Sequence, residues 1–312
     1  MGFAFALGLV IVACSSGTPP ADTGTSSSSG AAGASSGVAG SSGASSSSTS
    51  SGSPGSAGLL ERTAGCGKPA TVSGTSGTNG TTASSRKYVY FVPTGYDPAR
   101  AYPLVFTLHG SGATGAQMAA YIKMQDYVRD NPNTPSGNGN AIAVFPTAVG
   151  GDWDFSGTSD LLFFDTMVTD LSAALCVNQT RVFALGFSRG AYMANHLGCA
   201  RAGKVKAIAA ADGGFPDSAA GCGKLPALVY HRDEDDVVLV AEGRKARDAW
   251  VGIDACTMQT SPTLDAALNC VKYGCAPGAD VLWCEDTATS PYKHDLRAPY
   301  RVPIWNWFNA RP

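Results

Sequence analysis

Residues 184–196 read ALGFSRGAYMANH and place one serine, Ser188, between two glycines. The run RVFAL at residues 181–185 is short and apolar, which predicts a buried strand, and the residues after the serine are expected to form a helix. A turn this sharp brings the neighbours of Ser188 against other chain segments, so Gly186 and Gly190 are needed on either side. The hydroxyl then stands clear of the sheet, beside the free N–H groups of the helix N-terminus. G-x-S-x-G in this context predicts a nucleophile elbow.

The chain around this motif predicts one large domain that follows a low-complexity segment. Residues 15–58 are almost entirely Ser, Gly, Ala and Thr and bury too little apolar surface to offset the entropy of ordering, so we expect a flexible linker there. Residues 59–312 are enough for one domain with a sizeable core. The net charge of -2, without a basic block, gives no indication of nucleic-acid binding.

Short apolar segments alternate with helical ones along residues 59–312. Strands are predicted at residues 86–93, 102–108, 141–145, 181–185, 205–211, 227–231 and 281–284, and helices at residues 116–130, 159–176, 190–199 and 241–251. This alternation favours an α/β fold with a mostly parallel central sheet and helices on both faces. In such sheets the chemistry collects at the carboxyl ends of the strands.

The N-terminal residues are predicted to direct export. Met1 to Ala13 is apolar but shorter than the ~20 residues that span a bilayer, as in a signal peptide. It ends in Ile11-Val12-Ala13-Cys14, which resembles the lipobox of bacterial lipoproteins and implies lipidation of Cys14. Ser15, rather than Asp, follows this cysteine, as in lipoproteins that Gram-negative bacteria sort to the outer membrane. Residues 1–14 therefore predict an outer-membrane lipid anchor. The alternative is a plain secretory signal with an incidental cysteine.

The other eight cysteines are expected to form disulfides in an oxidising compartment. No CxxC pair or HxxxH motif occurs, so the spacing does not predict a metal site. Eight cysteines allow 105 pairings. We expect one link between Cys256 and Cys275, and another between Cys270 and Cys284.

A serine nucleophile needs a histidine base, which an acid must orient. The chain has four histidines. His109 is expected to shape the adjacent loop, His196 lies two turns into the helix after Ser188, and His231 ends a predicted strand. His294, in a loop after the strand at residues 281–284, is therefore the candidate base.

The order serine, acid, histidine is that of α/β-hydrolases and places the acid between Ser188 and His294. The acidic cluster after the predicted strand at residues 227–231 lies where this acid is expected. Spacing alone leaves Asp233, Asp235 and Asp236 open.

Backbone N–H groups near the serine are the candidate oxyanion donors. One is expected from Arg189, the residue after the nucleophile. The second is expected from the loop after the strand at residues 102–108, from Ser111 or Gly112. Such a mechanism requires no metal and no cofactor.

Several separate motifs occur in one order along the chain. They lie at residues 64–68, 88–93, 95–98, 102–104, 109–110, 175–177, 181–183, 186–188, 231–235, 243–244 and 247–248. Together they resemble the secreted feruloyl esterases and the related polyhydroxybutyrate depolymerase group, over nearly all of residues 66–312. The resemblance implies an α/β-hydrolase fold, a serine esterase mechanism, and Asp235 as the acid beside Ser188 and His294. Three positions depart from the family pattern: Arg232 and Ala191, where glycines are usual, and His294, which lacks a preceding Gly-Gly pair.

The resemblance implies a feruloyl or acetyl xylan esterase that acts on plant cell-wall esters. Trp153, on the loop after the strand at residues 141–145, is a candidate to stack a sugar or an aromatic acyl group, with simple packing as the alternative. A depolymerase of polyhydroxybutyrate or another polyester is the second hypothesis. A non-catalytic surface binding module is the third, suggested by the departures from the pattern.

Overall fold

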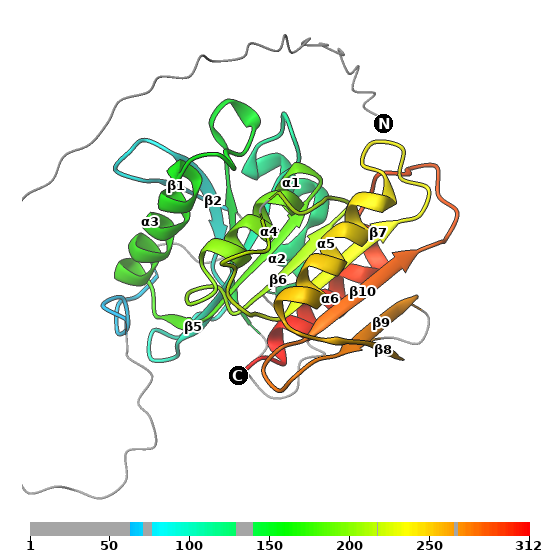
Figure 1. Cartoon of the computed structure of the whole chain (residues 1–312). Helices are drawn as coiled ribbons and strands as arrows, with labels where there is room; N and C mark the ends of the chain where they lie inside the picture. Colours follow the sequence, from blue (N-terminus) through cyan, green and yellow to red (C-terminus); the bar gives the residue numbers. More distant parts are fainter. Residues whose placement is uncertain (1–62, 71–76, 129–139, 217, 265–267) are drawn as a thin grey trace, which may run out of the picture. The chain divides into compact units, whose positions relative to one another are not determined.

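A ten-stranded sheet forms the centre of the structure (Figure 1). The computed structural model describes residues 63–70, 77–128, 140–216, 218–264 and 268–312. The predicted signal, Cys14 and the linker at residues 15–58 lie outside these residues. None of the helices within them is long and apolar enough to cross a membrane.

The strand order across the sheet is β1-β2-β4-β3-β5-β6-β7-β10-β9-β8. The strands are β1 (Thr78–Thr81), β2 (Lys87–Phe91), β3 (Tyr102–Leu108), β4 (Ile142–Pro146), β5 (Val177–Phe187), β6 (Ala207–Ala211), β7 (Ala227–Arg232), β8 (Thr257–Pro262), β9 (Cys270–Gly274) and β10 (Val281–Asp286). The strands from β4 to β10 in this order pair in parallel, and the pairs outside them are antiparallel. Strands β3, β4, β6 and β7 are buried along their whole length, which explains their uninterrupted apolar runs.

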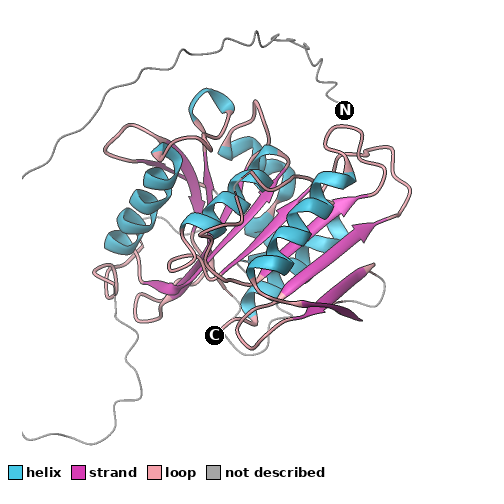
Figure 2. Cartoon of the chain, in the orientation of Figure 1, coloured by secondary structure: helices cyan, strands magenta, loops and turns pink. Residues whose placement is uncertain are grey.

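Helices cover both faces of this sheet (Figure 2). They are α1 (Gly115–Ile122), α2 (Met124–Val128), α3 (Ser159–Ala174), α4 (Arg189–Ala200), α5 (Val240–Ile253) and α6 (Ala298–Asn309), with a short 3-10 turn at Val149–Gly151. Side chains of α3, α4 and α5 belong to one core cluster, and those of α1, α2 and α6 to the other. Trp250 of α5 and Trp305 of α6 are fully buried, one in each cluster. The predicted α/β architecture is therefore confirmed.

The single helix expected over residues 116–130 is wrong. Helix α1 ends at Ile122, and the next residue, Lys123, has a left-handed φ of 54° and donates its backbone N–H to the Ala119 carbonyl. Helix α2 starts directly after it. A residue with positive φ ends a helix, and nothing in the apolar spacing reveals it.

Strands β1 and β8 were not expected because neither carries an apolar run. Strand β1 reads TNGT and β8 reads TMQTSP, and both are largely exposed edge strands. Strand β5 is also longer than the predicted residues 181–185, since the polar residues 178–180 precede the apolar run.

Four disulfides cross-link the described residues. Cys256–Cys275 and Cys270–Cys284 are confirmed as expected. The two other disulfides are Cys66–Cys176, which closes 110 residues, and Cys199–Cys222. Such a set is typical of proteins that fold in an oxidising compartment.

Candidate functional site

Ser188 lies at the turn between β5 and α4, with φ of 56° and ψ of -124°. Positive φ is strained for a residue with a side chain, and such strain is found at functional sites. A Cβ on Gly186 would lie 1.9 Å from the Gly190 carbonyl oxygen, and a Cβ on Gly190 would lie 2.2 Å from the Leu108 carbonyl oxygen. Both flanking positions therefore require glycine, as the motif predicted.

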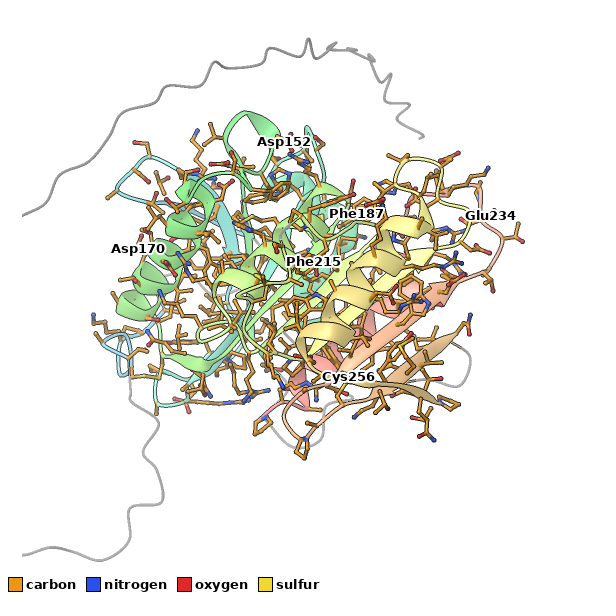
Figure 3. The ribbon with its side chains drawn as sticks, in the orientation of Figure 1. Asp152, Asp170, Phe187, Phe215, Glu234 and Cys256 are labelled. Carbon is orange, nitrogen blue, oxygen red and sulfur yellow. A yellow bond between two sulfur atoms is a disulfide. The ribbon has the colours of Figure 1, made fainter. Side chains whose placement is uncertain are left out.

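The predicted residues follow the carboxyl ends of three parallel strands, with β6 lying between the first two of them. Ser188 follows β5, Asp235 follows β7, and His294 lies on the loop between β10 and α6. Figure 3 shows Phe187 and Glu234, the residues before Ser188 and Asp235, at this end of the sheet, and Cys256 at the opposite end.

Asp235 and His294 are joined by a hydrogen bond of 2.7 Å between Oδ2 and Nδ1. Asp235 is buried, and its Oδ1 accepts the backbone N–H groups of Val237 and Val238 at 2.9 Å each. Burial alone would raise the pKa of Asp235, but hydrogen bonds from His231 and His294 and from the Val237 backbone lower it well below the usual range. The carboxyl is therefore ionised and holds the Nδ1–H tautomer of the imidazole.

The other two acids of the cluster do not contact this imidazole. Asp236 pairs instead with Lys293 at 3.8 Å on the surface. Asp233 makes a backbone hydrogen bond to the Asp286 carbonyl oxygen. Of the three aspartates that the spacing left open, the structure brings Asp235 to His294.

The second ring nitrogen of His294, Nε2, is not used by Asp235. Nε2 is buried and has no hydrogen-bond partner among the described residues. The imidazole packs on Phe187, with ring centroids 4.8 Å apart, and Phe187 directly precedes Ser188. Since Nδ1 carries the proton shared with Asp235, Nε2 is the lone-pair atom that can accept a proton.

Two backbone N–H groups lie next to Ser188 without an acceptor in the described part of the chain. As the first residue of α4, Arg189 has no intrahelical acceptor for its N–H. The Ser111 N–H follows Gly110, at which a Cβ would lie 3.2 Å from the Ser188 Cβ. The alternative donor, Gly112, is excluded because its N–H donates to the Gly151 carbonyl at 2.8 Å.

The stacking role considered for Trp153 is wrong. Its side chain is only 3% exposed, and Nε1 donates to the His109 carbonyl at 2.9 Å. A ring buried in this way has no face on which a substrate group could stack, so the packing alternative holds. His109 is structural as expected: Nδ1 donates to the Gly110 carbonyl, Nε2 accepts the Ala148 N–H, and burial lowers its pKa.

Two departures from the family pattern are accommodated by neighbouring residues. Ala191 is fully buried, and the space for its methyl group exists because Gly213 has no side chain: a Cβ there would lie 2.5 Å from the Ala191 Cβ. Arg232 does not have positive φ, so its backbone does not require glycine.

A buried ionic network at the base of the His294 loop was missed by sequence reasoning. Arg232 donates to Asp286 Oδ2 at 3.3 Å and to the Ala288 carbonyl at 2.8 Å, and Arg297 donates to Asp286 at 2.8 Å. The Tyr230 hydroxyl donates to Asp286 at 2.8 Å. These contacts tie both ends of the loop that carries His294 to β7 and β10. A charged residue ending a buried strand, as Asp286 does, is a signal that could have found it.

A second residue missed in the sequence is Asp212, directly after β6. One carboxylate oxygen of Asp212, one of Asp235 and one ring nitrogen of His294 lie within 4.8 Å of one another. Among the described residues, these three side chains bring their ligand atoms close enough together to share a cation. The proton between His294 and Asp235 already occupies part of this position.

Comparison with curated proteins identifies close relatives of the chain. It is 30% identical over 266 residues to feruloyl esterase D of Neurospora crassa, covering 79% of this chain and 90% of that protein. It is 30% identical over 202 residues to a probable feruloyl esterase C of Aspergillus terreus, covering 62% of this chain and 70% of that protein. No family model matches the sequence.

Solved esterase structures share the fold. The acetyl xylan esterase from Aspergillus awamori superposes with a TM-score of 0.55 at 14% identity, over 75% of this chain and 100% of that chain. The feruloyl esterase module of Clostridium thermocellum, complexed with sinapinate, superposes with a TM-score of 0.55 at 13% identity, over 76% of this chain and 87% of that chain. The expected α/β-hydrolase fold is confirmed. With the identity to the Neurospora crassa protein across most of its length, the chain belongs to the feruloyl esterase family of carboxylic ester hydrolases.

Proposed function

We propose that the chain hydrolyses hydroxycinnamate esters of plant cell-wall polysaccharides, with Ser188 as nucleophile, His294 as base and Asp235 as the orienting acid. The observation that carries this proposal is the 2.7 Å hydrogen bond between His294 Nδ1 and Asp235 Oδ2, which leaves Nε2 free to take the serine proton. The relatives named feruloyl esterase support the substrate class.

The reaction proceeds through an acyl-enzyme. His294 Nε2 accepts the proton of the Ser188 hydroxyl as the oxygen attacks the ester carbonyl, and then gives it to the departing sugar alcohol. The N–H groups of Arg189 and Ser111 stabilise the oxyanion, each worth ~10²–10³ in turnover. Water, deprotonated by the same imidazole, then releases the hydroxycinnamic acid and frees the serine.

Aromatic side chains beside Ser188 support an aromatic acyl group. Tyr121 is 40% exposed and packs on Phe187 with ring centroids 5.4 Å apart. On the α4 side, the Arg189 guanidinium lies 4.2 Å from the ring of the half-buried Phe155. Flat, polarisable surfaces of this kind favour offset stacking on an aromatic ring, which an acetyl group cannot exploit.

The test is hydrolysis of methyl ferulate and of feruloylated arabinoxylan by the purified, oxidised protein, followed by release of ferulate. Ser188→Ala, which keeps the fold and removes the nucleophile, is the control. We expect release by the wild-type protein and none above background by the variant. If the protein hydrolyses p-nitrophenyl acetate but releases no ferulate, the substrate assignment is wrong and the assignment as an esterase stands.

Polyester depolymerisation is the competing activity, and the same preparation decides it. Clearing of a polyhydroxybutyrate suspension without ferulate release would show that the substrate is a polyester rather than a cell-wall ester. Failure of Ser188 to react with a fluorophosphonate in folded protein would favour the surface binding module.

We further propose that residues 1–14 are a lipoprotein signal, that Cys14 is lipidated, and that residues 15–58 tether the hydrolase to the outer membrane. The tetrad at residues 11–14 and the four disulfides support export. At ~5–6 Å times the square root of length, a linker of about 45 residues spans roughly 35–40 Å. Mass spectrometry of the mature N-terminal peptide tests this: a diacylglyceryl Cys14 supports the anchor, and an unmodified or differently cleaved terminus contradicts it.

A further inference from the structure

Asp212 is a buried carboxyl that the proposed mechanism does not use. It is fully buried directly after β6, and its Oδ1 accepts the Arg232 backbone N–H at 2.9 Å. Its Oδ2 has no hydrogen-bond partner among the described residues. A buried polar atom without a partner is costly, so a functional reason for this one is to be sought.

The Asp212 carboxyl faces the imidazole from a different strand than Asp235 does. Atoms of the two carboxyls and of His294 lie within 4.8 Å of one another. The Asp235 oxygens are fully engaged, Oδ1 by two backbone N–H groups and Oδ2 by His294, whereas Asp212 keeps one unused oxygen. His294 therefore has one acid in contact with it and a second carboxyl close by.

Burial favours the neutral form of Asp212. Desolvation raises its pKa well above the usual range, and the negative charge of Asp235 adds to this effect. The backbone N–H groups of Arg232 and Asp295 and the Arg232 guanidinium act in the opposite direction. Of these two neighbouring carboxyls, Asp235 is therefore the one that ionises more readily.

The two tyrosines that face Asp212 do not supply charge. Tyr121 from α1 and Tyr230 from β7 both have a pKa raised by burial, so both are neutral. His231 of β7 donates its Nε2–H to the Val238 carbonyl at 2.8 Å. The charged neighbours are Arg232, whose guanidinium acts on Asp212, and Asp295, whose carboxyl accepts the Tyr121 hydroxyl.

We propose that Asp212 is a positioning residue for His294, a reserve acid that releases its proton and supplies the negative charge beside the imidazole when Asp235 is neutralised. Loss of the Asp235 charge removes the repulsion that adds to burial in raising the pKa of Asp212, so the Asp212 carboxyl ionises more readily. Asp212 then gives its proton to solvent, and its carboxylate stabilises the imidazolium formed when His294 takes the serine proton. The inference rests on the proposed function of Ser188 and His294.

The experiment compares kcat/KM for methyl ferulate in Asp235→Asn and in the double variant Asp235→Asn with Asp212→Asn. Neutralising the acid of a triad typically costs ~10⁴-fold. We expect Asp235→Asn to lose only about 10²-fold, because Asp212 replaces the charge, and the double variant to lose about 10²-fold more. The residual activity of Asp235→Asn should rise with pH as Asp212 loses its proton.

A matched control separates a reserve acid from a general effect of changing a buried aspartate. Asp254 is fully buried at the end of α5, beside Leu225 rather than beside the site, and its pKa is also raised by burial. Adding Asp254→Asn to Asp235→Asn should leave the residual activity unchanged. Equal activity of Asp235→Asn and its Asp212→Asn double variant would overturn the proposal.

A second substitution covers the case in which Asp212→Asn folds poorly. Asp212 has φ of 50°, a left-handed conformation that glycine adopts without strain, so Asp212→Gly removes the carboxyl while relieving the backbone. Unfolding midpoints of each variant, measured by circular dichroism, establish that the folded forms are being compared.

A measurement independent of turnover distinguishes failure of this inference from failure of the proposed function. Imidazole NMR gives the pH midpoint at which the His294 ring becomes protonated. We expect this midpoint to lie about one pH unit higher in Asp235→Asn than in the double variant, because only the single variant keeps a carboxylate beside the ring. Equal midpoints contradict the reserve acid. Absence of esterase activity in the wild-type protein contradicts the proposed function alone.

Discussion

His294 Nδ1 lies 2.7 Å from Asp235 Oδ2, so the loop between β10 and α6 is held in register with the carboxyl end of β7. This contact spans 59 residues of sequence, and the sheet order makes it possible because β10 pairs directly with β7. The site is thus assembled by the parallel pairing of strands that lie far apart in the chain.

Gly190→Ala is expected to reduce esterase activity strongly and to lower the free energy of unfolding by about 1–3 kcal/mol. The added methyl carbon would lie 2.2 Å from the Leu108 carbonyl oxygen, so the start of α4 must move away from β3 and carry Ser188 with it. Gly203→Ala is the control, since a Cβ there meets no heavy atom within 4 Å. Urea unfolding and methyl ferulate hydrolysis measure both effects. Equal behaviour of the two variants would show that the turn tolerates a side chain.

Arg232→Met is expected to lower kcat by about tenfold and leave KM nearly unchanged. The variant removes one of the donors to buried Asp286 and the donor to the Ala288 carbonyl, which loosens the loop that carries His294. Arg244→Met is the matched control, because the Arg244–Glu285 pair at 2.6 Å is half-exposed and contributes at most ~1 kcal/mol. Steady-state kinetics separate the two parameters. A pure rise in KM for Arg232→Met would contradict a role in placing the base.

The sequence predicted the parts of the fold that carry an apolar signal. The runs at residues 102–108 and 181–185 became β3 and the buried part of β5, and the glycines around Ser188 fixed the turn between β5 and α4. The polar edge strands β1 and β8 left no such signal. The break at Lys123 was also invisible, since a left-handed residue need not be glycine.

The candidate site residues were proposed from the sequence, but their surroundings were not. The G-x-S-x-G motif indicated Ser188, elimination among the histidines left His294, and the choice among neighbouring aspartates needed the hydrogen bond that the structure shows for Asp235. Asp212 and Asp286 escaped because their partners come from other strands, and sequence spacing does not report pairs brought together by sheet order. The substrate contact expected of Trp153 was wrong because a loop residue at the carboxyl edge of the sheet can still point into the core.

Asp254→Asn is expected to change how stability depends on pH. Burial raises the pKa of Asp254 to about 6, opposed by a hydrogen bond from the Leu225 backbone and by the charge of Lys224. Because the unfolded chain loses this proton near pH 4 and the folded chain only near pH 6, the wild-type protein loses stability as pH rises through this window, by about 1.4 kcal/mol per pH unit at most.

The variant has no proton to lose at this position. Its free energy of unfolding, relative to the wild-type protein, should therefore increase between pH 4 and pH 6 and stay level above that. Urea unfolding at several pH values measures the difference. A difference that does not change with pH would show that Asp254 ionises normally in the folded protein.

The disulfide Cys66–Cys176 is expected to contribute more stability than Cys256–Cys275. It closes 110 residues against 19, and the entropy removed from the unfolded chain grows with loop length, to about 4–5 kcal/mol against about 3 kcal/mol. Paired Cys→Ser variants of each bridge, compared by guanidinium unfolding, test this order. The reverse order would indicate that the folded state, rather than the unfolded chain, sets the contribution.

The most direct measurement of the central claim is the rate at which a fluorophosphonate labels Ser188, with the modified peptide located by mass spectrometry, in the wild-type protein and in His294→Ala. We expect labelling at Ser188 and a rate at least ~10³-fold lower in the variant, because the imidazole no longer accepts the serine proton. Labelling at another residue, or equal rates in the two proteins, would contradict it.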